Sequence, residues 1–244
     1  MIASTPSDFK PILFITGLGR SGSRLLLETL SINGLHCPIS SIKDQSDSIW
    51  ELAELNEANT FVEPYWEQVP VSFDSINSLS KEPARQEQIR TVVKAAAAEG
   101  ESKVLALKDP RIFFLTRLYR KIFPEAVFIH VYRNPYAYAL SEMEEKKHYK
   151  KTIHCLEFWL RYWDSMMEYW NTQADSRPGF EAICFESLMN NFDDTFRELL
   201  SRLGLVDQGK RPRLRQSRFR IEEIKNAKSN SNWHPPSAKK WGYE

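Results

Sequence analysis

The most constraining feature of the sequence is a glycine-rich turn between an apolar run and a segment of helical pattern. Residues 12–16 have the continuous apolar character of a strand that is covered on both faces of a parallel sheet. The turn Gly17-Leu-Gly-Arg-Ser-Gly22 follows directly, and residues 23–32 then show helical spacing. Such a turn directs backbone N–H groups and the positive end of the helix dipole toward one point. The sequence therefore predicts a site for a phosphate-like anion here.

Strand and helix patterns alternate along the rest of the chain. Further apolar runs predict strands at 104–107, 126–132 and 181–185, and helical patterns cover 49–59, 83–99, 112–122, 152–171 and 191–203. Residues 64–81 have no clear period, so a loop is expected there. This alternation predicts an α/β fold in a single domain over residues 1–244, with a P-loop-like parallel sheet of about four to five strands and helices on both faces.

Composition excludes several classes of protein. The formal net charge is +1, so no strong overall field would attract nucleic acid or an anionic membrane. No apolar run approaches the length of a membrane span, and none is expected. The three cysteines are far apart and form no CxxC pair, which argues against a zinc site or a disulfide framework. A reducing, cytoplasmic location is expected for such a chain.

The residues of the turn discriminate among the chemistries that use such loops. Gly17, Gly19 and Gly22 satisfy the dinucleotide pattern GxGxxG, but the acidic residue expected about 20 positions on, Asp44, follows a poor strand candidate. Gly17 and Gly22 also have the spacing of a nucleoside triphosphate loop. That loop would continue with Lys and Ser or Thr, whereas Ser23 and Arg24 stand here.

The cation of the turn is Arg20, inside the loop itself. This position suits an anion that carries no tightly held metal better than it suits a magnesium nucleoside triphosphate, so no metal is expected.

A second anion site is expected at the end of the 126–132 strand. Arg133 follows the strand at its carboxyl end, where ligands bind in open α/β sheets. Asn134 and Pro135 are typical of a helix start, and Ser141 lies about two turns along that helix. The plain alternative is that Arg133 only caps the strand and that Ser141 is a surface residue.

Together, these two motifs resemble those of the PAPS-dependent sulfotransferases (PAPS is 3′-phosphoadenosine 5′-phosphosulfate), in their bacterial and tyrosylprotein-like branch. The Arg-Ser-Gly-Ser stretch of the turn resembles the family's 5′-phosphosulfate loop, and Arg-Asn-Pro-x6-Ser resembles its 3′-phosphate motif. The resemblance implies that PAPS is bound by two sets of residues: Gly19, Arg20, Ser21, Gly22, Ser23 and Arg24 in the loop, and Arg133 and Ser141 beyond it. The family often has a small hydroxyl residue where Arg24 stands, so only the backbone N–H of Arg24 is carried over.

The resemblance also suggests catalytic residues. Sulfuryl transfer needs cations near the transferred group and a base for the acceptor proton. Arg20 is the first cation, and Lys108, in a Lys-Asp-Pro stretch similar to the family's, is the second. The base is expected at Glu51, beside Trp50. Its rivals are the carboxylates Glu54, Asp44 and Asp47. The alternatives are that Lys108 pairs with Asp109 or caps the strand, and that Glu51 lies on a solvated helix face.

Two further cofactor contacts follow from the resemblance. Phe185 stands where the family often has a tyrosine that contacts the nucleotide, although a plain core position explains it equally well. Residues 237–241 are similar to a closing segment of the family, which implies that Lys240 meets a phosphate and that the tail 208–244 covers the cofactor. An exposed tail is the alternative.

The function that follows is transfer of a sulfuryl group to a hydroxyl or an amine. The acceptor would be a small molecule, a glycan or another carbohydrate, or a peptide. A P-loop nucleotide or nucleoside kinase and an inactive nucleotide-binding protein are the alternative functions. The sequence lacks the Gly-Lys-Ser/Thr motif that a P-loop kinase requires. An inactive nucleotide-binding protein would keep both phosphate motifs but would not need Lys108.

Overall fold

The computed structural model describes residues 11–38, 51–66, 68–79, 81–148, 154–174, 178–212 and 221–243. At its centre lies a four-stranded parallel sheet in the order β2-β1-β3-β4. The strands are β1 (Ile12–Thr16), β2 (Leu105–Lys108), β3 (Val127–Tyr132) and β4 (Phe180–Cys184). The predicted parallel α/β fold is confirmed, and every strand boundary lies within one residue of the prediction.

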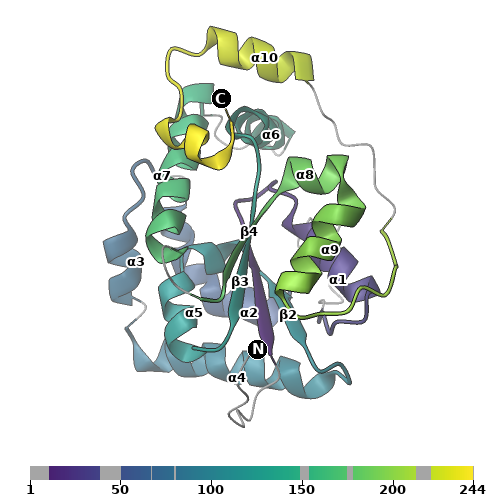
Figure 1. The fold of residues 1–244 in the computed structure, drawn as a ribbon. Coiled ribbons are helices and arrows are strands. Elements are labelled where there is room, and N and C mark those ends of the chain that lie inside the picture. Colours follow the sequence, from purple (N-terminus) through teal and green to yellow (C-terminus); the bar gives the residue numbers. More distant parts are fainter. Residues whose placement is uncertain are drawn as a thin grey trace.

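Helices cover both faces of the sheet (Figure 1). Alternate side chains of β1 enter separate cores: Ile12 and Phe14 on one face, Leu13 and Ile15 on the other. The second face is covered by α1 (Ser23–Ile32), α8 (Phe185–Asn190) and α9 (Phe192–Arg202). The first face is covered by α2 (Ala53–Asn59), α3 (Phe73–Leu79), α4 (Pro83–Glu99), α5 (Thr116–Ile122), α6 (Pro135–His148) and α7 (Leu156–Ala174). The remaining elements are α10 (Ile221–Asn230) and the 3₁₀ helices η2 (Thr60–Tyr65), η3 (Pro110–Phe113) and η4 (Pro236–Trp241).

The helix predictions hold for α1, α4 and α9, within one residue at each end, and need correction elsewhere. The expected loop at 64–81 contains α3, whose Ile76 is fully buried, so this segment packs on the core. The expected helix 112–122 is divided between η3 and α5. Phe113, Phe114 and Leu115 are consecutive and all buried, which one straight helix with a single apolar face does not allow. The expected helices 49–59 and 152–171 begin at Ala53 and Leu156, and residues 49–50 and 152–153 lie outside the described ranges.

The long helix α7 is a core element. Trp159, Trp163 and Trp170 are each about 1% exposed, so its aromatic stripe packs inside the molecule. Among the described residues, no helix combines the length and the apolar character needed to span a bilayer.

The sheet determines where the predicted site residues meet. Because all four strands are parallel, their carboxyl ends lie at one edge, where open α/β sheets bind ligands. β1 leads into the glycine-rich turn, β2 ends with Lys108, and β3 ends just before Arg133. In the strand register, Ile15 lies beside Lys108 and Thr16 beside His130. The predicted loop, the predicted catalytic lysine and the predicted phosphate-binding arginine therefore share one edge.

Candidate active site

The glycine-rich turn has the backbone geometry of an anion cradle. Gly22 is the N-cap of α1 with φ 96°, and no side chain caps the helix. A Cβ on Gly22 would lie 2.1 Å from the ring of Phe185, so only glycine fits here. Arg20 also has a positive φ, 63°, which is uncommon for a residue other than glycine. The amide of Ser23, the first residue of α1, has no acceptor within the helix, and such an amide can bind an anion.

Ser21 adds a hydroxyl beneath this cradle. The residue is 2% exposed, and its Oγ has no hydrogen-bond partner among the described residues. A Cβ on Gly17 would lie 2.5 Å from this Oγ, so the hydroxyl fills the space that the glycine leaves open. A buried polar atom without a partner costs free energy. Ser21 Oγ is therefore a candidate donor to an oxygen that enters the turn.

Arg133 lies directly beside the turn. Its Nη1 donates a hydrogen bond of 3.3 Å to the carbonyl oxygen of Arg20. Its guanidinium carbon lies 5.1 Å from the centre of the Phe185 ring, and its Nε is 4.0 Å from Glu186 Oε1. Burial lowers the pKa of Arg133, and the charge of Glu186 opposes this effect. The buried Nε has no hydrogen-bond partner among the described residues.

The two predicted anion motifs contact each other. Ser141 lies on α6, and its Oγ accepts a hydrogen bond of 3.2 Å from Nε of Arg20. The same Nε is 3.6 Å from Glu145 Oε2. Gly19 of the turn also approaches α6, because a Cβ there would lie 3.1 Å from Glu142 Oε1. Folding therefore brings Arg20, Arg133 and Ser141 to one place, although the loop and α6 are more than 100 residues apart in the chain.

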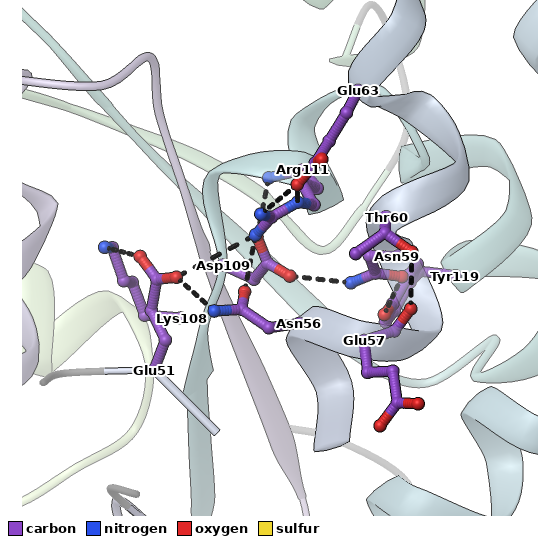
Figure 2. A network of polar contacts seen from close by, with 10 residues as sticks. All are labelled: Glu51, Asn56, Glu57, Asn59, Thr60, Glu63, Lys108, Asp109, Arg111 and Tyr119. Atoms are coloured by element: carbon purple, nitrogen blue, oxygen red, sulfur yellow. Dashed lines mark hydrogen bonds and ion pairs between the residues drawn. The ribbon is translucent and has the colours of Figure 1, made fainter. Parts of the chain in front are cut away.

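Lys108 and Glu51 form a buried ion pair (Figure 2). Their side chains are 8% and 9% exposed. The second carboxylate oxygen of Glu51 accepts 2.8 Å from Asn56 Nδ2 and lies 3.9 Å from Arg111 Nη1. Two alternatives from the sequence do not hold. Lys108 pairs with Glu51 and not with Asp109, and Glu51 is buried instead of lying on a solvated face.

A polar network continues from this pair (Figure 2). Asp109 accepts from Arg111 N at 2.8 Å, as expected of the cap of a short helix, and also from Asn59 Nδ2 at 2.9 Å. Burial raises the pKa of Asp109, and Arg111 opposes the rise. Arg111 also donates to Asn56 Oδ1 at 2.6 Å and to Glu63.

The sequence reasoning missed Asn56, Asn59 and Arg111 as members of the site. A signal existed: Asn56 and Asn59 are polar and three positions apart in a helix, next to Leu55 and Ala58 of its apolar face.

The remaining predicted site residues are Phe185, Lys240 and the rival bases, and they differ in whether they contact the turn or Arg133. Phe185 is the first residue of α8 and not part of a strand; its ring packs between Gly22 and Arg133, at the wall of the cradle. Lys240 is exposed on η4, and no contact among the described residues joins it to the turn or to Arg133. Among the rival bases, Glu54 is exposed on α2. Asp44, Asp47 and the expected neighbour Trp50 lie outside the described residues.

A family model described as Sulfotransferase family matches residues 11–208. The chain belongs to the sulfotransferase family. The resemblance inferred from the two phosphate motifs is thus confirmed at the level of the family. No curated protein sequence matches the chain significantly. Among the described residues, no group of three or more His, Cys, Asp or Glu side chains could hold a metal ion.

Solved sulfotransferases have a similar fold. The domain from the Synechococcus olefin synthase is 17% identical with a TM-score of 0.55, over 97% of this chain and 86% of that one. STF1 from Mycobacterium tuberculosis is 16% identical with a TM-score of 0.55, over 91% and 71%. The domain from the curacin biosynthetic pathway is 19% identical with a TM-score of 0.53, over 80% and 74%. At these identities, the likeness establishes the fold of this sulfotransferase.

Proposed function

We propose that this sulfotransferase moves a sulfuryl group from PAPS to a hydroxyl or an amine of a small-molecule, carbohydrate or peptide acceptor. The observation that carries the proposal is the direct contact between the two anion motifs: Arg20 donates to Ser141, and Arg133 donates to the carbonyl of Arg20. A ligand with two separate anionic groups, one at each end of an adenosine, suits such a site.

The residues present fit this co-substrate. The glycine-rich turn, with backbone groups of Gly19, Gly22 and Ser23 and the hydroxyl of Ser21, would hold the 5′-phosphosulfate. Ser21 Oγ and Arg133 Nε are buried polar atoms without hydrogen-bond partners in the described structure, as expected of groups that a ligand completes. Arg133 and Ser141 would hold the 3′-phosphate, since an arginine fork suits a terminal phosphate.

Three further residues complete the proposed nucleotide site. Arg24 would contribute only its backbone N–H, and Phe185 would form the wall next to the nucleotide. Lys240 would reach a phosphate from η4.

Three residues are proposed to carry the chemistry. PAPS, when bound, supplies a sulfuryl group that is activated by its bond to a phosphate. Arg20 and Lys108 would stabilise negative charge on the oxygens of the transferred group and of the leaving phosphate. Glu51 would accept the proton of the acceptor. It lies against the Lys108 ammonium, and it would act once an acceptor hydroxyl or amine takes the place of that ammonium.

Calorimetric titration tests the nucleotide. We expect adenosine 3′,5′-bisphosphate (PAP) to bind, and both magnesium ATP and NADH to bind far more weakly. Arg133→Ala should weaken binding of PAP, whereas Arg197→Ala, an exposed arginine on α9, serves as the matched control. Tighter binding of magnesium ATP would instead support a kinase.

Transfer of radiolabelled sulfate from PAPS to a panel of alcohols, sugars, amines and tyrosine peptides tests the reaction. PAP binding without transfer to any of them would support the inactive nucleotide-binding protein.

We also propose that residues 1–244 act as one catalytic domain, because the described helices pack on the two faces of one sheet. A cytoplasmic location is proposed from the thiols of Cys37, Cys155 and Cys184, which are free. Burial raises the pKa of Cys37 to about 12, so this thiol is chemically inert at neutral pH. Fractionation of cells that express the full chain checks the location.

A further inference from the structure

Glu186, in the first turn of α8, connects three separate parts of the chain. Its Oε2 accepts hydrogen bonds from Tyr243 Oη at 2.7 Å and from Cys184 Sγ at 3.3 Å. Its Oε1 accepts from the backbone N–H of Asn134 at 3.0 Å and lies 4.0 Å from Nε of Arg133. One carboxylate thus joins α8, the start of α6 and the C-terminal segment, defined here as residues 236–243.

On one side, Glu186 holds the position of the predicted 3′-phosphate residues. Asn134 donates its backbone N–H to Glu186 and caps α6, because Asn134 Oδ1 accepts from the N–H groups of Tyr136 at 3.0 Å and Ala137 at 3.2 Å. Arg133 immediately precedes this cap, and Ser141 lies on the same helix. The orientation of both predicted phosphate ligands therefore depends on where Glu186 is held.

The distance between Glu186 and Arg133 is the important detail. At 4.0 Å, the carboxylate compensates part of the charge of the buried guanidinium without forming a hydrogen bond to Nε. A direct hydrogen-bonded ion pair would be stronger, and it would compete with a phosphate for the same donors. The carboxylate instead accepts hydrogen bonds from the hydroxyl of Tyr243, the thiol of Cys184 and the N–H of Asn134.

On the other side, the C-terminal segment is attached to the same edge of the sheet (Figure 1). The ring of Trp241 lies 4.5 Å from that of Tyr132, the last residue of β3, and the ring of Tyr243 lies 6.3 Å from that of Trp163. Trp163 in turn donates to the carbonyl oxygen of Arg133 at 3.0 Å. Burial raises the pKa of Tyr243, so its hydroxyl remains a donor to Glu186 at physiological pH.

We propose that Glu186 is a positioning residue for the 3′-phosphate site and that Tyr243 sets the affinity of this site by restraining Glu186. This inference rests on the proposed binding of PAPS. With Tyr243 docked, Arg133 keeps its donors for the phosphate. Without the Tyr243 hydroxyl, Glu186 moves onto Arg133 and competes with the nucleotide.

Calorimetric titration with PAP and with adenosine 5′-monophosphate, which lacks the 3′-phosphate, tests the inference. Tyr243→Phe should weaken PAP binding by about tenfold, the scale of one competing charge-assisted hydrogen bond, and leave the monophosphate unchanged. Glu186→Gln, which keeps the shape and removes the charge, should bind PAP at least as tightly as the wild type. In the Tyr243→Phe background, Glu186→Gln should restore the affinity for PAP.

The matched control is Tyr169→Phe, which removes the hydroxyl of a buried tyrosine that donates to the carbonyl of Phe114 at 3.4 Å. It should leave PAP binding unchanged. If the wild type binds no PAP, the proposed function and this inference both fall. If the wild type binds PAP and Tyr243→Phe binds it equally well, or loses PAP and monophosphate alike, only the inference falls. If Tyr243→Phe does not fold, the single variant Glu186→Gln still tests the inference. A tenfold loss of PAP affinity in that variant would overturn the inference.

Discussion

Replacing Lys108 by methionine tests the buried ion pair at the predicted catalytic centre. Methionine keeps the length of the side chain and removes the ammonium, so Glu51 loses its closest partner. Removing one member of a buried pair typically costs about 3–5 kcal/mol, because the other charge remains buried. Glu51 keeps its hydrogen bond from Asn56 at 2.8 Å and lies 3.9 Å from Arg111. We therefore expect the low end, about 3 kcal/mol of unfolding free energy.

The double variant identifies the pair as the cause. In Lys108→Met/Glu51→Gln, the buried carboxylate charge is removed together with the ammonium, and the glutamine can still accept from Asn56. Its stability should therefore exceed that of Lys108→Met alone, with a coupling energy of roughly 2 kcal/mol. For a chain of this size, a loss of about 3 kcal/mol corresponds to a drop in Tm of roughly 6–12 °C.

The same variants separate stability from chemistry. Neither Lys108 nor Glu51 belongs to the predicted 3′-phosphate motif, so PAP affinity should fall far less than the rate of transfer. Any loss of PAP affinity in Lys108→Met would reflect its proposed contact with the leaving phosphate, which PAP retains. Transfer should fall by roughly 10²–10³ in Lys108→Met and in Glu51→Gln made alone, the usual effect of losing a preorganised charge in a catalytic site. Urea unfolding, calorimetry with PAP and a radiolabelled transfer assay give the three readouts.

The reasoning would be refuted if the double variant were no more stable than Lys108→Met, since the cost would then not come from the unpaired carboxylate. Transfer at the wild-type rate in the folded Lys108→Met variant would remove Lys108 from the chemistry and leave it a structural role.

Three other predictions address the phosphate motifs and the core. Arg133→Ala should weaken PAP binding by about tenfold to a hundredfold, as expected when a charge-assisted pair is lost, and equal affinity by calorimetry would argue against the 3′-phosphate site. Arg20→Ala should lower the rate of transfer far more than PAP affinity if Arg20 acts mainly in the transition state, so equal losses of both would reduce its role to anchoring. Burial lowers the pKa of His130 from 6.5 to about 3, so below pH 6.5 the unfolded chain binds a proton that the folded chain does not. At about 1.4 kcal/mol per pH unit, the wild type should lose roughly 3 kcal/mol of stability between pH 6.5 and pH 4, and His130→Phe should lose much less in urea melts at the two pH values.

Much of the fold could be predicted from local patterns. Continuous apolar runs identified the four strands, because a parallel sheet that is covered on both faces requires such runs. The glycine-rich turn could be predicted because its conformation requires glycine in the sequence. Gly22 has a positive φ, and a Cβ there would clash with the ring of Phe185. The helix boundaries failed where burial overrode the period, as at Phe113 to Leu115, and where α3 packs on the core in a segment without a clear pattern.

The sequence by itself also determined the order of the two anion motifs and the family to which the chain belongs. Only the tertiary structure decided the partners of the side chains. The hydrogen bond from Arg20 to Ser141 spans 121 positions, the pair of Lys108 with Glu51 spans 57, and the bond from Tyr243 to Glu186 also spans 57. Patterns along the chain report strands, helices and turns because these depend on neighbours in sequence. Charged partners are selected by which groups the packed elements bury together, since a buried charge without a partner is too costly to retain.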